Sequence, residues 1–417
     1  MCKLAENIKA PVVGHADRHN ILSEYQHGFR RKRSCETQLL LTTHDLASAY
    51  KKRKQIDMIV LDFTKAFDKV PHRRLLKKLE HYGVRGSTLA WIRDFLSGRS
   101  QTVLLEGETS SGAPVISGVP QGTVMGPILF LLYINDLPEG LSSNVRLFAD
   151  DCVLYREIST RNDSSMLQND LDLLNKWEKA WQMEFNPSKC AVLSFTASKS
   201  HPEYNYYIHN EMLARAKEHK YLGVMLSSDF KWSSHINSAA NKARQTLGFV
   251  KRNTKSMSRS VRDAAYRSLV RPHLEYASVV WDPHTGRDID RLEGVQRHAA
   301  RYVIGDYRRG SSVTNMLNDL KWEPLARRRM VARQTMVFRI LRGEVAIPRD
   351  LFFQYNEYQQ TRRSTSFKLT RSQPRGNIDK FAFAQRAVPE WNSLPAHVVD
   401  APSVDAFRLR LLNFLKM

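Results

Sequence analysis

The chain has 417 residues, of which 42% are hydrophobic and 10% aromatic, a composition typical of globular rather than disordered proteins. Lysine and arginine outnumber aspartate and glutamate by 64 to 42, so the net charge is +22. That surplus favours a polyanionic partner, because each neutralised phosphate releases counterions; a basic protein without such a partner is the alternative. The four cysteines form no C-x-x-C zinc half-site, so we expect buried thiols in a reducing compartment.

Neither a signal peptide nor a membrane span is indicated. The N-terminus has no apolar core of the signal type, and the longest apolar run of note, residues 127–134, is far too short to cross a bilayer. We therefore expect a soluble intracellular protein, in the nucleus and cytoplasm, with no membrane partner. The sequence does not indicate an oligomeric state.

The first elements surround an acidic residue. Residues 1–33 are polar and weakly patterned, and a helix capped by Ser34 is predicted to follow. Residues 58–61 form a β-rich run that ends at Asp62, and Pro71 stands where the next helix begins.

Two strands and a buried helix are predicted next. Residues 100–106 and 110–116 have strand patterns around a turn at Gly107. Residues 124–136 are apolar on nearly all sides, which is typical of a buried helix.

A hairpin with an acidic tip follows. Residues 145–148 and 152–155 are short apolar runs, and Asp150 and Asp151 stand between them. We expect both aspartates at the tip of the turn.

Beyond the hairpin, the pattern changes from mixed to helical. An amphipathic helix is predicted over 164–183, a strand over 191–195, and a further hairpin from the run 221–226 and the Ser-Ser-Asp turn after it. Helices then follow from Ser233, over 261–276 and over 288–304, and a loop over 305–312. An α+β domain is thus expected before a mostly helical one.

The carboxylates are the strongest candidates for chemistry. Asp62 after one strand and the Asp150-Asp151 pair at a hairpin tip would suit a site in which separate strands converge on two divalent cations. Mg²⁺ prefers a few carboxylates completed by waters and phosphates. Taken alone, the pair is equally well read as an ordinary turn, since aspartate is common there.

Five segments in order resemble motifs A to E of reverse transcriptases: VLDFTKAFD at 60–68, SGVPQGTVMGP at 117–127, FADD at 148–151, NPSKC at 186–190 and YLGV at 221–224. The ordered set is far more specific than any single box. The runs HGFR at 27–30 and AFDKVPH at 66–72 are more similar to LINE-type (non-LTR) retrotransposons than to retroviral enzymes. The resemblance covers about residues 22–230, and two tail segments, 288–304 and WNSLP at 391–395, also resemble such elements.

This resemblance implies a catalytic set of residues. Asp62 and Asp150 would ligate two Mg²⁺ or Mn²⁺ ions, Asp151 would be the partner carboxylate, and the carbonyl of Phe63 would help to hold the nucleotide-side metal. Lys189 would protonate the leaving pyrophosphate as a general acid; without the resemblance it is as well explained as a solvated surface lysine.

The resemblance also implies a nucleotide site. The ring of Phe67, five residues after Asp62, would exclude a 2′-hydroxyl and so favour deoxynucleotides; on composition alone it would be a core aromatic. Gln121 and Gly122 would contact the incoming nucleotide, and the alternative is a plain strand-to-helix turn.

The implied partners are an RNA template, a DNA primer, their RNA–DNA hybrid and deoxynucleoside triphosphates. Contacts to nucleic acid would come from the fingers, the primer-grip hairpin and the thumb, and the candidates are Arg30, Arg31, Tyr221, Leu222, Gly223, Lys242 and Arg244. A run of charges is otherwise usually a solvated face.

The expected architecture is an α+β right-hand polymerase with an antiparallel sheet and packed helices in its palm. Its predicted parts are partial fingers (1–57), a palm with the remaining fingers elements (58–230), a helical thumb (231–304) and a basic, mostly helical C-terminal region (313–417).

In this family an endonuclease usually precedes the polymerase, and the first fingers motifs precede the position of His27. We expect this chain to lack both, because it has no room for them before His27. Poor nucleotide binding could follow. The reading as an RNA-directed DNA polymerase therefore competes with a catalytically silent, truncated remnant that at most binds RNA. A viral RNA-dependent RNA polymerase is disfavoured by the bulky Phe67, and a telomerase-like or intron-maturase enzyme fits the wording of the motifs less well.

Overall fold

The structure is a computed structural model that describes residues 2–198, 201–355, 368–374 and 376–416. It divides into two compact units. The first comprises Met1–Gln38 and Arg53–Lys217, and the second comprises Leu39–Lys52 and Glu218–Met417.

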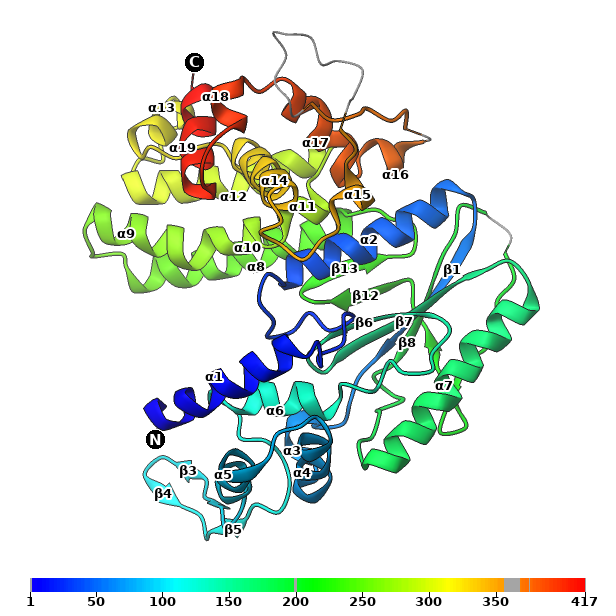
Figure 1. Ribbon diagram of the computed structural model, residues 1–417. Helices are drawn as coiled ribbons and strands as arrows, with labels where there is room; N and C mark the ends of the chain where they lie inside the picture. Colours follow the sequence, from blue (N-terminus) through cyan, green and yellow to red (C-terminus); the bar gives the residue numbers. More distant parts are fainter. Residues whose placement is uncertain (1, 199–200, 356–367, 375, 417) are drawn as a thin grey trace. The chain divides into compact units, whose positions relative to one another are not determined.

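A five-stranded sheet organises the first unit, with strand order β11-β8-β1-β7-β6 (Figure 1). Its members are β1 (Gln55–Leu61), β6 (Asn144–Phe148), β7 (Asp151–Ile158), β8 (Ala191–Phe195) and β11 (Ala214–Arg215). The central strand β1 pairs antiparallel with both β7 and β8, and all of its residues are buried. Only β11 runs parallel to its neighbour, β8. The apolar, β-branched sequence of β1 suits this doubly covered position.

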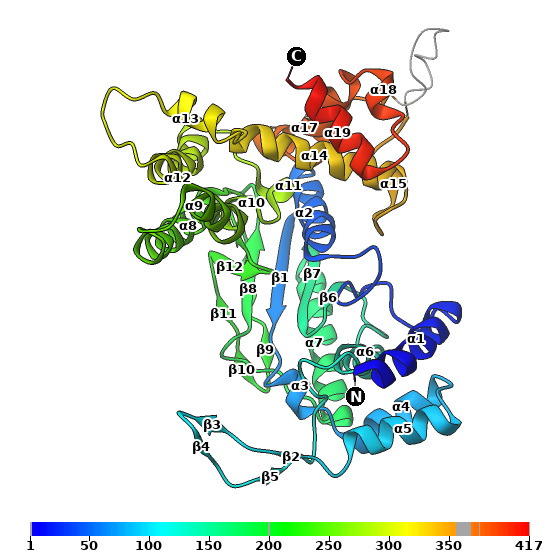
Figure 2. The same ribbon diagram turned by 90° about the vertical axis from the view of Figure 1, so that its left-hand side faces the viewer.

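The remaining elements of the first unit are mostly helices. These are α1 (Cys2–Arg18), the start of α2 (Cys35–Lys51), α3 (Ala66–Lys69), α4 (His72–His81), α5 (Gly86–Leu96), α6 (Gly126–Tyr133) and α7 (Arg161–Trp181). The short strands are β2 (Ser100–Gln101), β3 (Leu104–Leu105), β4 (Glu108–Thr109), β5 (Ala113–Pro114), β9 (Tyr207–Ile208) and β10 (Glu211–Met212). A ribbon of β2 to β5 projects beyond α5 (Figure 2).

One face of the sheet is packed against α6 and α7. Ile59 and Leu61 of β1 share a hydrophobic core with residues of both helices, and their cross-strand partners Leu154 and Cys152 belong to the same core. Because side chains alternate along a strand, residues at the even positions of β1 point to the opposite face. Asp62 continues that alternation, so its carboxylate faces away from α6 and α7.

The second unit is helical apart from one hairpin of β12 (Glu218–Tyr221) and β13 (Val224–Ser227). Its helices are α8 (Ser233–Asn253), α9 (Arg259–Ala265), the π-helical turn η1 (Tyr266–Val270), α10 (Arg271–Glu275), α11 (Ser278–Trp281), α12 (Gly286–Ile304), α13 (Val313–Asp319), α14 (Leu325–Leu341), α15 (Arg349–Phe352), α16 (Asn377–Lys380), α17 (Phe383–Asn392), α18 (Ala396–Val399) and α19 (Val404–Phe414). The central α14 packs against α11, α17 and α19.

The predicted α+β class, an antiparallel sheet with packed helices followed by a helical region, is confirmed. The division into four parts is not tested by these two units and stays a prediction. None of the described helices is both long and apolar enough to cross a membrane.

Several local predictions need correction. Helix α1 lies in the segment that the sequence left unpatterned. The run 221–226 contains the turn of a hairpin, because Leu222 and Gly223 have positive φ angles of 45° and 83°. The expected long strands over 100–116 are four two-residue strands. Asp151 pairs with Phe148 as the first residue of β7, so only Asp150 of the two aspartates lies in the turn.

Candidate functional site

Asp62 stands directly after β1, where strand pairing fixes its backbone. Leu61 pairs with Cys152 across the antiparallel ladder, so continuing the register places Asp62 opposite Asp151. On the other edge, the backbone N–H of Asn186 donates to the Asp62 carbonyl at 2.8 Å. The strand therefore delivers this carboxylate beside the tip of the neighbouring hairpin.

Phe63 anchors the segment after Asp62 to the chain near residue 185. Its ring stacks on that of Phe185 with centroids 4.3 Å apart, and the two residues form an antiparallel bridge. The N–H of Thr64 completes this bridge by donating to the carbonyl of Glu184 at 2.8 Å. In such a bridge the carbonyl of Phe63 itself points away from Phe185 and is available to another ligand.

Asp150 occupies the turn between β6 and β7, where Ala149 has a left-handed φ of 52°. Burial raises the pKa of Asp150, and the negative charge of Asp62 adds to the effect. Desolvation, together with the charges of Asp150 and Asp62, raises the pKa of Asp151 to about 6. The three carboxylates thus share one electrostatic environment.

The oxygen atoms around Asp62 and the Asp150–Asp151 pair are of the kind that divalent ions prefer. The Oδ2 atom of Asp62 is buried and accepts no hydrogen bond from the described residues. Among those residues, no group of three or more His, Cys, Asp or Glu side chains is arranged to hold a metal by itself. Mg²⁺ needs only one or two carboxylates when waters and phosphates complete its shell, so the oxygens of Asp62, Phe63, Asp150 and Asp151 fit an open site.

Lys189 lies beside these carboxylates. Its Nζ is 3.3 Å from Asp62 Oδ2, and its side chain is 64% exposed. Lys189 sits in the turn before β8, where its N–H donates to the carbonyl of Asn186 at 3.0 Å. The lysine is therefore held at the edge of the site with its ammonium open to solvent.

The loop that carries Gln121 is tied to the turn after Asp62. Gln121 Nε2 donates to Asp68 Oδ1 at 3.2 Å, and Ser117 Oγ donates to the Asp68 carbonyl at 2.9 Å. A Cβ at Gly118 would come within 2.7 Å of that same carbonyl, so the close approach requires glycine. Gly122 has a φ of 74° and open space around it.

Phe67 lies in α3, between Asp62 and that loop in the chain. Its ring is half-buried and stacks on Phe130 of α6, with centroids 4.2 Å apart. The carbonyl of Phe67 accepts from the N–H of Val119 at 2.7 Å. The ring is therefore fixed in orientation, with part of its surface open.

Gln26 is a residue of the site that the sequence did not single out. It is 2% exposed, and its Oε1 accepts from the N–H groups of Ala149 at 2.8 Å and Gly28 at 2.7 Å. Its Nε2 donates to the Ala149 carbonyl at 3.3 Å. A Cβ at Gly28 would come within 2.3 Å of Ala149 N. Gln26 thus holds Ala149, the left-handed residue that precedes Asp150. The position of Gln26 directly before the HGFR run is the sequence signal that could have identified it.

The two predicted fingers arginines differ. Arg30 donates to the carbonyls of Leu22 at 3.1 Å and Ser23 at 2.6 Å, and burial lowers its pKa. Arg31 is exposed. Arg30 therefore stabilises its own loop, whereas Arg31 faces solvent.

The predicted primer-grip residues form the β12–β13 turn in the second unit. Tyr221 is buried, and the Leu222 carbonyl accepts from the hydroxyl of Tyr276 at 2.9 Å. A Cβ at Gly223 would lie 2.9 Å from the Tyr276 ring. The turn is thus held by α10 and the residue that follows it.

Lys242 and Arg244 lie on the exposed side of α8, whose buried side includes Ala243 and Leu247. Arg244 Nη1 donates to Asn241 Oδ1 at 3.0 Å. Both charges are open to solvent, as an electrostatic contact to phosphates requires.

Comparison with known proteins places this site in context. Residues 2–226 match the family described as reverse transcriptase (RNA-dependent DNA polymerase). The probable RNA-directed DNA polymerase from transposon X-element of Drosophila melanogaster is 26% identical over 307 residues, which cover 72% of this chain and 34% of that relative. The RNA-directed DNA polymerase from mobile element jockey of Drosophila funebris is 28% identical over 299 residues, 68% of this chain and 32% of that relative.

The chain spans about a third of the length of these curated relatives. Among solved structures, apo telomerase from Candida tropicalis is 9% identical, with 75% of this chain and 51% of that chain covered and a TM-score of 0.44.

Replacing Gln26 by methionine is expected to loosen the turn that carries Asp150. The Gln26→Met side chain has a similar shape but leaves the buried N–H groups of Ala149 and Gly28 without an acceptor, at a cost of about 2–4 kcal/mol. Urea unfolding, monitored by circular dichroism, measures this loss in the free energy of unfolding. Gln38→Met is the matched control, since Gln38 is equally buried but donates to the carbonyl of Leu147 at 3.4 Å. Equal losses in both variants would contradict a special role for Gln26.

Neutralising Asp151 is expected to stabilise the metal-free protein in a pH-dependent way. Because the pKa of Asp151 is raised to about 6 from an ordinary value of 3.8, its ionisation disfavours the folded state as pH rises from about 4 to 6. Asp151→Asn should melt at the same temperature as the parent near pH 4, and roughly 1–3 °C higher above pH 6.

Thermal melting in a chelator-containing pH series checks this expectation. The exposed Asp94→Asn provides the control for loss of one negative charge. A difference between Asp151→Asn and the parent that stays constant from pH 4 to 7 would disprove the raised pKa of Asp151.

Proposed function

Since the chain belongs to the reverse transcriptase (RNA-dependent DNA polymerase) family, in the group of LINE-type (non-LTR) retrotransposon enzymes represented by its X-element and jockey relatives, we propose that it extends a primer on an RNA template by two-metal nucleotidyl transfer. The observation that carries the proposal is the placement of Asp62 opposite the Asp150–Asp151 tip, where burial and the neighbouring carboxylates raise the pKa values of Asp150 and Asp151.

Asp62, Asp150, Asp151 and the carbonyl of Phe63 would hold two Mg²⁺ or Mn²⁺ ions. When bound, such ions lower the pKa of a primer 3′-hydroxyl and stabilise the charge of a leaving pyrophosphate. The buried Oδ2 of Asp62 is paired only with the exposed ammonium of Lys189 among the described residues, a partner that a metal ion could replace, and this supports its role as a ligand. Fixed backbone at both Asp62 and Ala149 would keep these oxygens oriented while substrates exchange.

Lys189 would supply a proton to the pyrophosphate. Its Nζ lies 3.3 Å from Asp62 Oδ2 and is largely exposed, so it can turn from the carboxylate toward a bound triphosphate. A general acid must come within hydrogen-bond reach of the leaving oxygen, and a flexible lysine at the edge of the site meets that requirement.

The nucleotide would lie between Phe67 and the loop of Gln121 and Gly122. The ring of Phe67, fixed by its stacking on Phe130, would exclude a 2′-hydroxyl. The exposed Gln121, held by Asp68, would contact the incoming deoxynucleoside triphosphate, and Gly122 would let the backbone come close.

The nucleic acid would be an RNA template with a DNA primer. Arg31, the turn of Tyr221, Leu222 and Gly223, and the exposed Lys242 and Arg244 of α8 are the proposed contacts; Arg30 would act through the loop it stabilises. Such contacts are mostly to phosphates and 2′-hydroxyls, because A-form duplexes offer few readable base edges. Copying RNA at a DNA target would take place inside the cell, in the cytoplasm and nucleus.

Replacing Asp150 by asparagine is expected to abolish extension while leaving RNA binding almost unchanged, because one metal ligand is lost without any phosphate-binding cation. The rate of primer extension on a homopolymer RNA template with Mg²⁺ or Mn²⁺ should fall by roughly 10³-fold or more. Asp94→Asn, an exposed carboxylate of α5, should retain the parent's rate. Extension by Asp150→Asn at the parent's rate would sink the site assignment, and a parent chain inactive with both ions would favour the silent remnant.

Shortening Phe67 is expected to admit ribonucleotides. Phe67→Val removes the ring beneath the sugar and should lower the preference for deoxynucleotides by roughly 10–100-fold, the range of a lost steric contact. Phe67→Tyr keeps the ring and should keep the preference. The ratio of kcat/KM for deoxy- and ribonucleotides measures the effect, and an unchanged ratio in Phe67→Val would exclude Phe67 as the gate.

A further inference from the structure

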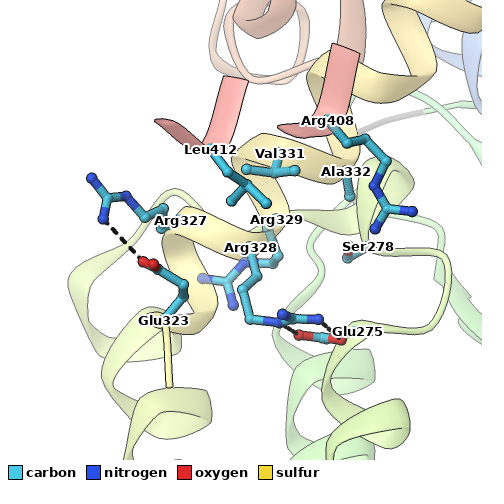
Figure 3. A pocket seen from close by; sticks show the side chains of 10 residues that line it. All are labelled: Glu275, Ser278, Glu323, Arg327, Arg328, Arg329, Val331, Ala332, Arg408 and Leu412. Atoms are coloured by element: carbon cyan, nitrogen blue, oxygen red, sulfur yellow. Dashed lines mark hydrogen bonds and ion pairs between the residues drawn. The ribbon is translucent and has the colours of Figure 1, made fainter. Parts of the chain in front are cut away.

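The second unit contains a pocket of about 230 Å³ that the proposed polymerase site does not use (Figure 3). It lies between α14 and α19, with the end of α10 and the start of α11 on a further side. Val331 and Leu412 give it apolar surface. Its other walls are charged.

Positive charge is in surplus around this pocket. The charged lining residues are Arg327, Arg328, Arg329, Arg408, Glu275 and Glu323. Both glutamates are already neutralised: Glu323 Oε2 accepts from Arg327 Nη1 at 3.0 Å, and Glu275 Oε2 accepts from Arg328 Nη2 at 3.0 Å (Figure 3). The charges of the two remaining arginines are therefore not offset by any carboxylate of the lining.

Arg329 is the more unusual of these two. It is only 1% exposed, and its Nε donates to Asp282 Oδ1 at 2.7 Å. Asp282 also pairs with Arg333 and Arg386, so three guanidinium groups share this carboxylate, and Glu390 pairs with Arg333 as a second carboxylate of the cluster. Arg329 Nη1 is buried without a hydrogen-bond acceptor among the described residues. The carboxylate of Glu293, whose Oε1 accepts from Ala326 N–H at 2.9 Å, also interacts electrostatically with Arg329.

Arg408 adds a mobile donor on the opposite wall. It lies on α19 and is exposed, and its guanidinium makes no ion pair or hydrogen bond within the part of the chain that the structure describes. A buried, incompletely satisfied cation and an exposed one thus face the same small pocket. A desolvated charge interacts strongly with an opposite charge, because the surrounding dielectric constant is low.

We propose that this pocket binds a phosphate group, with the unpaired Arg408 contacting it and the buried Arg329, whose Nη1 has no hydrogen-bond acceptor, attracting it. A tetrahedral dianion or a phosphodiester matches both the size of the pocket and the surplus of guanidinium donors, which bind phosphate well. Of the two sources of phosphate, a nucleic-acid strand agrees with the net charge of +22; a free phosphate has the same chemistry. The site does not depend on polymerase activity.

The pocket's need for an anion can be tested by supplying one internally. Ala332 lines the pocket one helical turn after Arg328 and Arg329, positions at which side chains meet on a helix. In phosphate-free buffer, Ala332→Glu should melt roughly 1–3 °C above Ala332→Gln, which has the same shape without the charge. An equal or lower melting temperature for Ala332→Glu would contradict the unbalanced charge.

The ligand is tested with two probes. Inorganic phosphate should raise the melting temperature of the parent and of Ala332→Gln, but not of Ala332→Glu or Arg408→Gln. Arg410→Gln, on the same helix, is the control, because Arg410 Nη1 donates to the His397 carbonyl at 2.6 Å and lies outside the pocket. For a single-stranded RNA, the slope of log Kd against log salt should fall by about 0.7 in Arg408→Gln for one lost phosphate contact.

If inorganic phosphate raises the melting temperatures of the parent and Ala332→Gln alone, the pocket binds free phosphate. If the slope of log Kd against log salt for RNA changes in Arg408→Gln but not in Arg410→Gln, the pocket binds a phosphate of a nucleic-acid strand. The proposal is overturned if Arg408→Gln and Arg410→Gln behave alike with both probes.

Discussion

The antiparallel pairing of β1 with β7 is the constraint on which the rest of the candidate site depends. Its register sets Leu61 against Cys152, and one further step sets Asp62 against Asp151. A shift of one residue would turn Asp62 toward α6 and α7, into the hydrophobic core. The buried faces of β1 prevent that shift, since every residue of the strand is covered. Core packing and the geometry of the candidate site are therefore set by the same hydrogen bonds.

Holding three carboxylates together has an electrostatic cost, which the raised pKa values of Asp150 and Asp151 express. The fold fixes the backbone on either side of these carboxylates with neutral hydrogen bonds. Gln26 satisfies both backbone groups of Ala149, and Asn186 holds the carbonyl of Asp62. Lys189, whose ammonium lies beside Asp62, is largely exposed. A buried lysine would compete with metal ions for the carboxylates, whereas neutral amides leave the negative charge available.

Much of this arrangement could be predicted from the sequence, and the failures have identifiable causes. Strand β1 ends directly before Asp62 as expected, because an apolar run followed by a polar residue marks a strand end. Gln26 was missed because its role comes from a contact with Ala149 across more than a hundred residues of chain. The run 221–226 was misjudged as continuous, since Leu222 adopts a left-handed φ that its side chain does not favour. Non-local contacts decide such positions, and local propensity does not reveal them.

The two arginine environments of the chain show how the same residue can serve structure or binding. Arg30 directs its guanidinium to backbone carbonyls, so its charge organises a loop. Around Asp282, by contrast, three guanidinium groups share this carboxylate and that of Glu390, and Arg329 keeps a nitrogen without an acceptor. Well-packed apolar residues would often be at least as stable as such a buried ionic cluster. Its retention beside a pocket is therefore better explained by a ligand that completes the balance of charge than by its contribution to the stability of the fold.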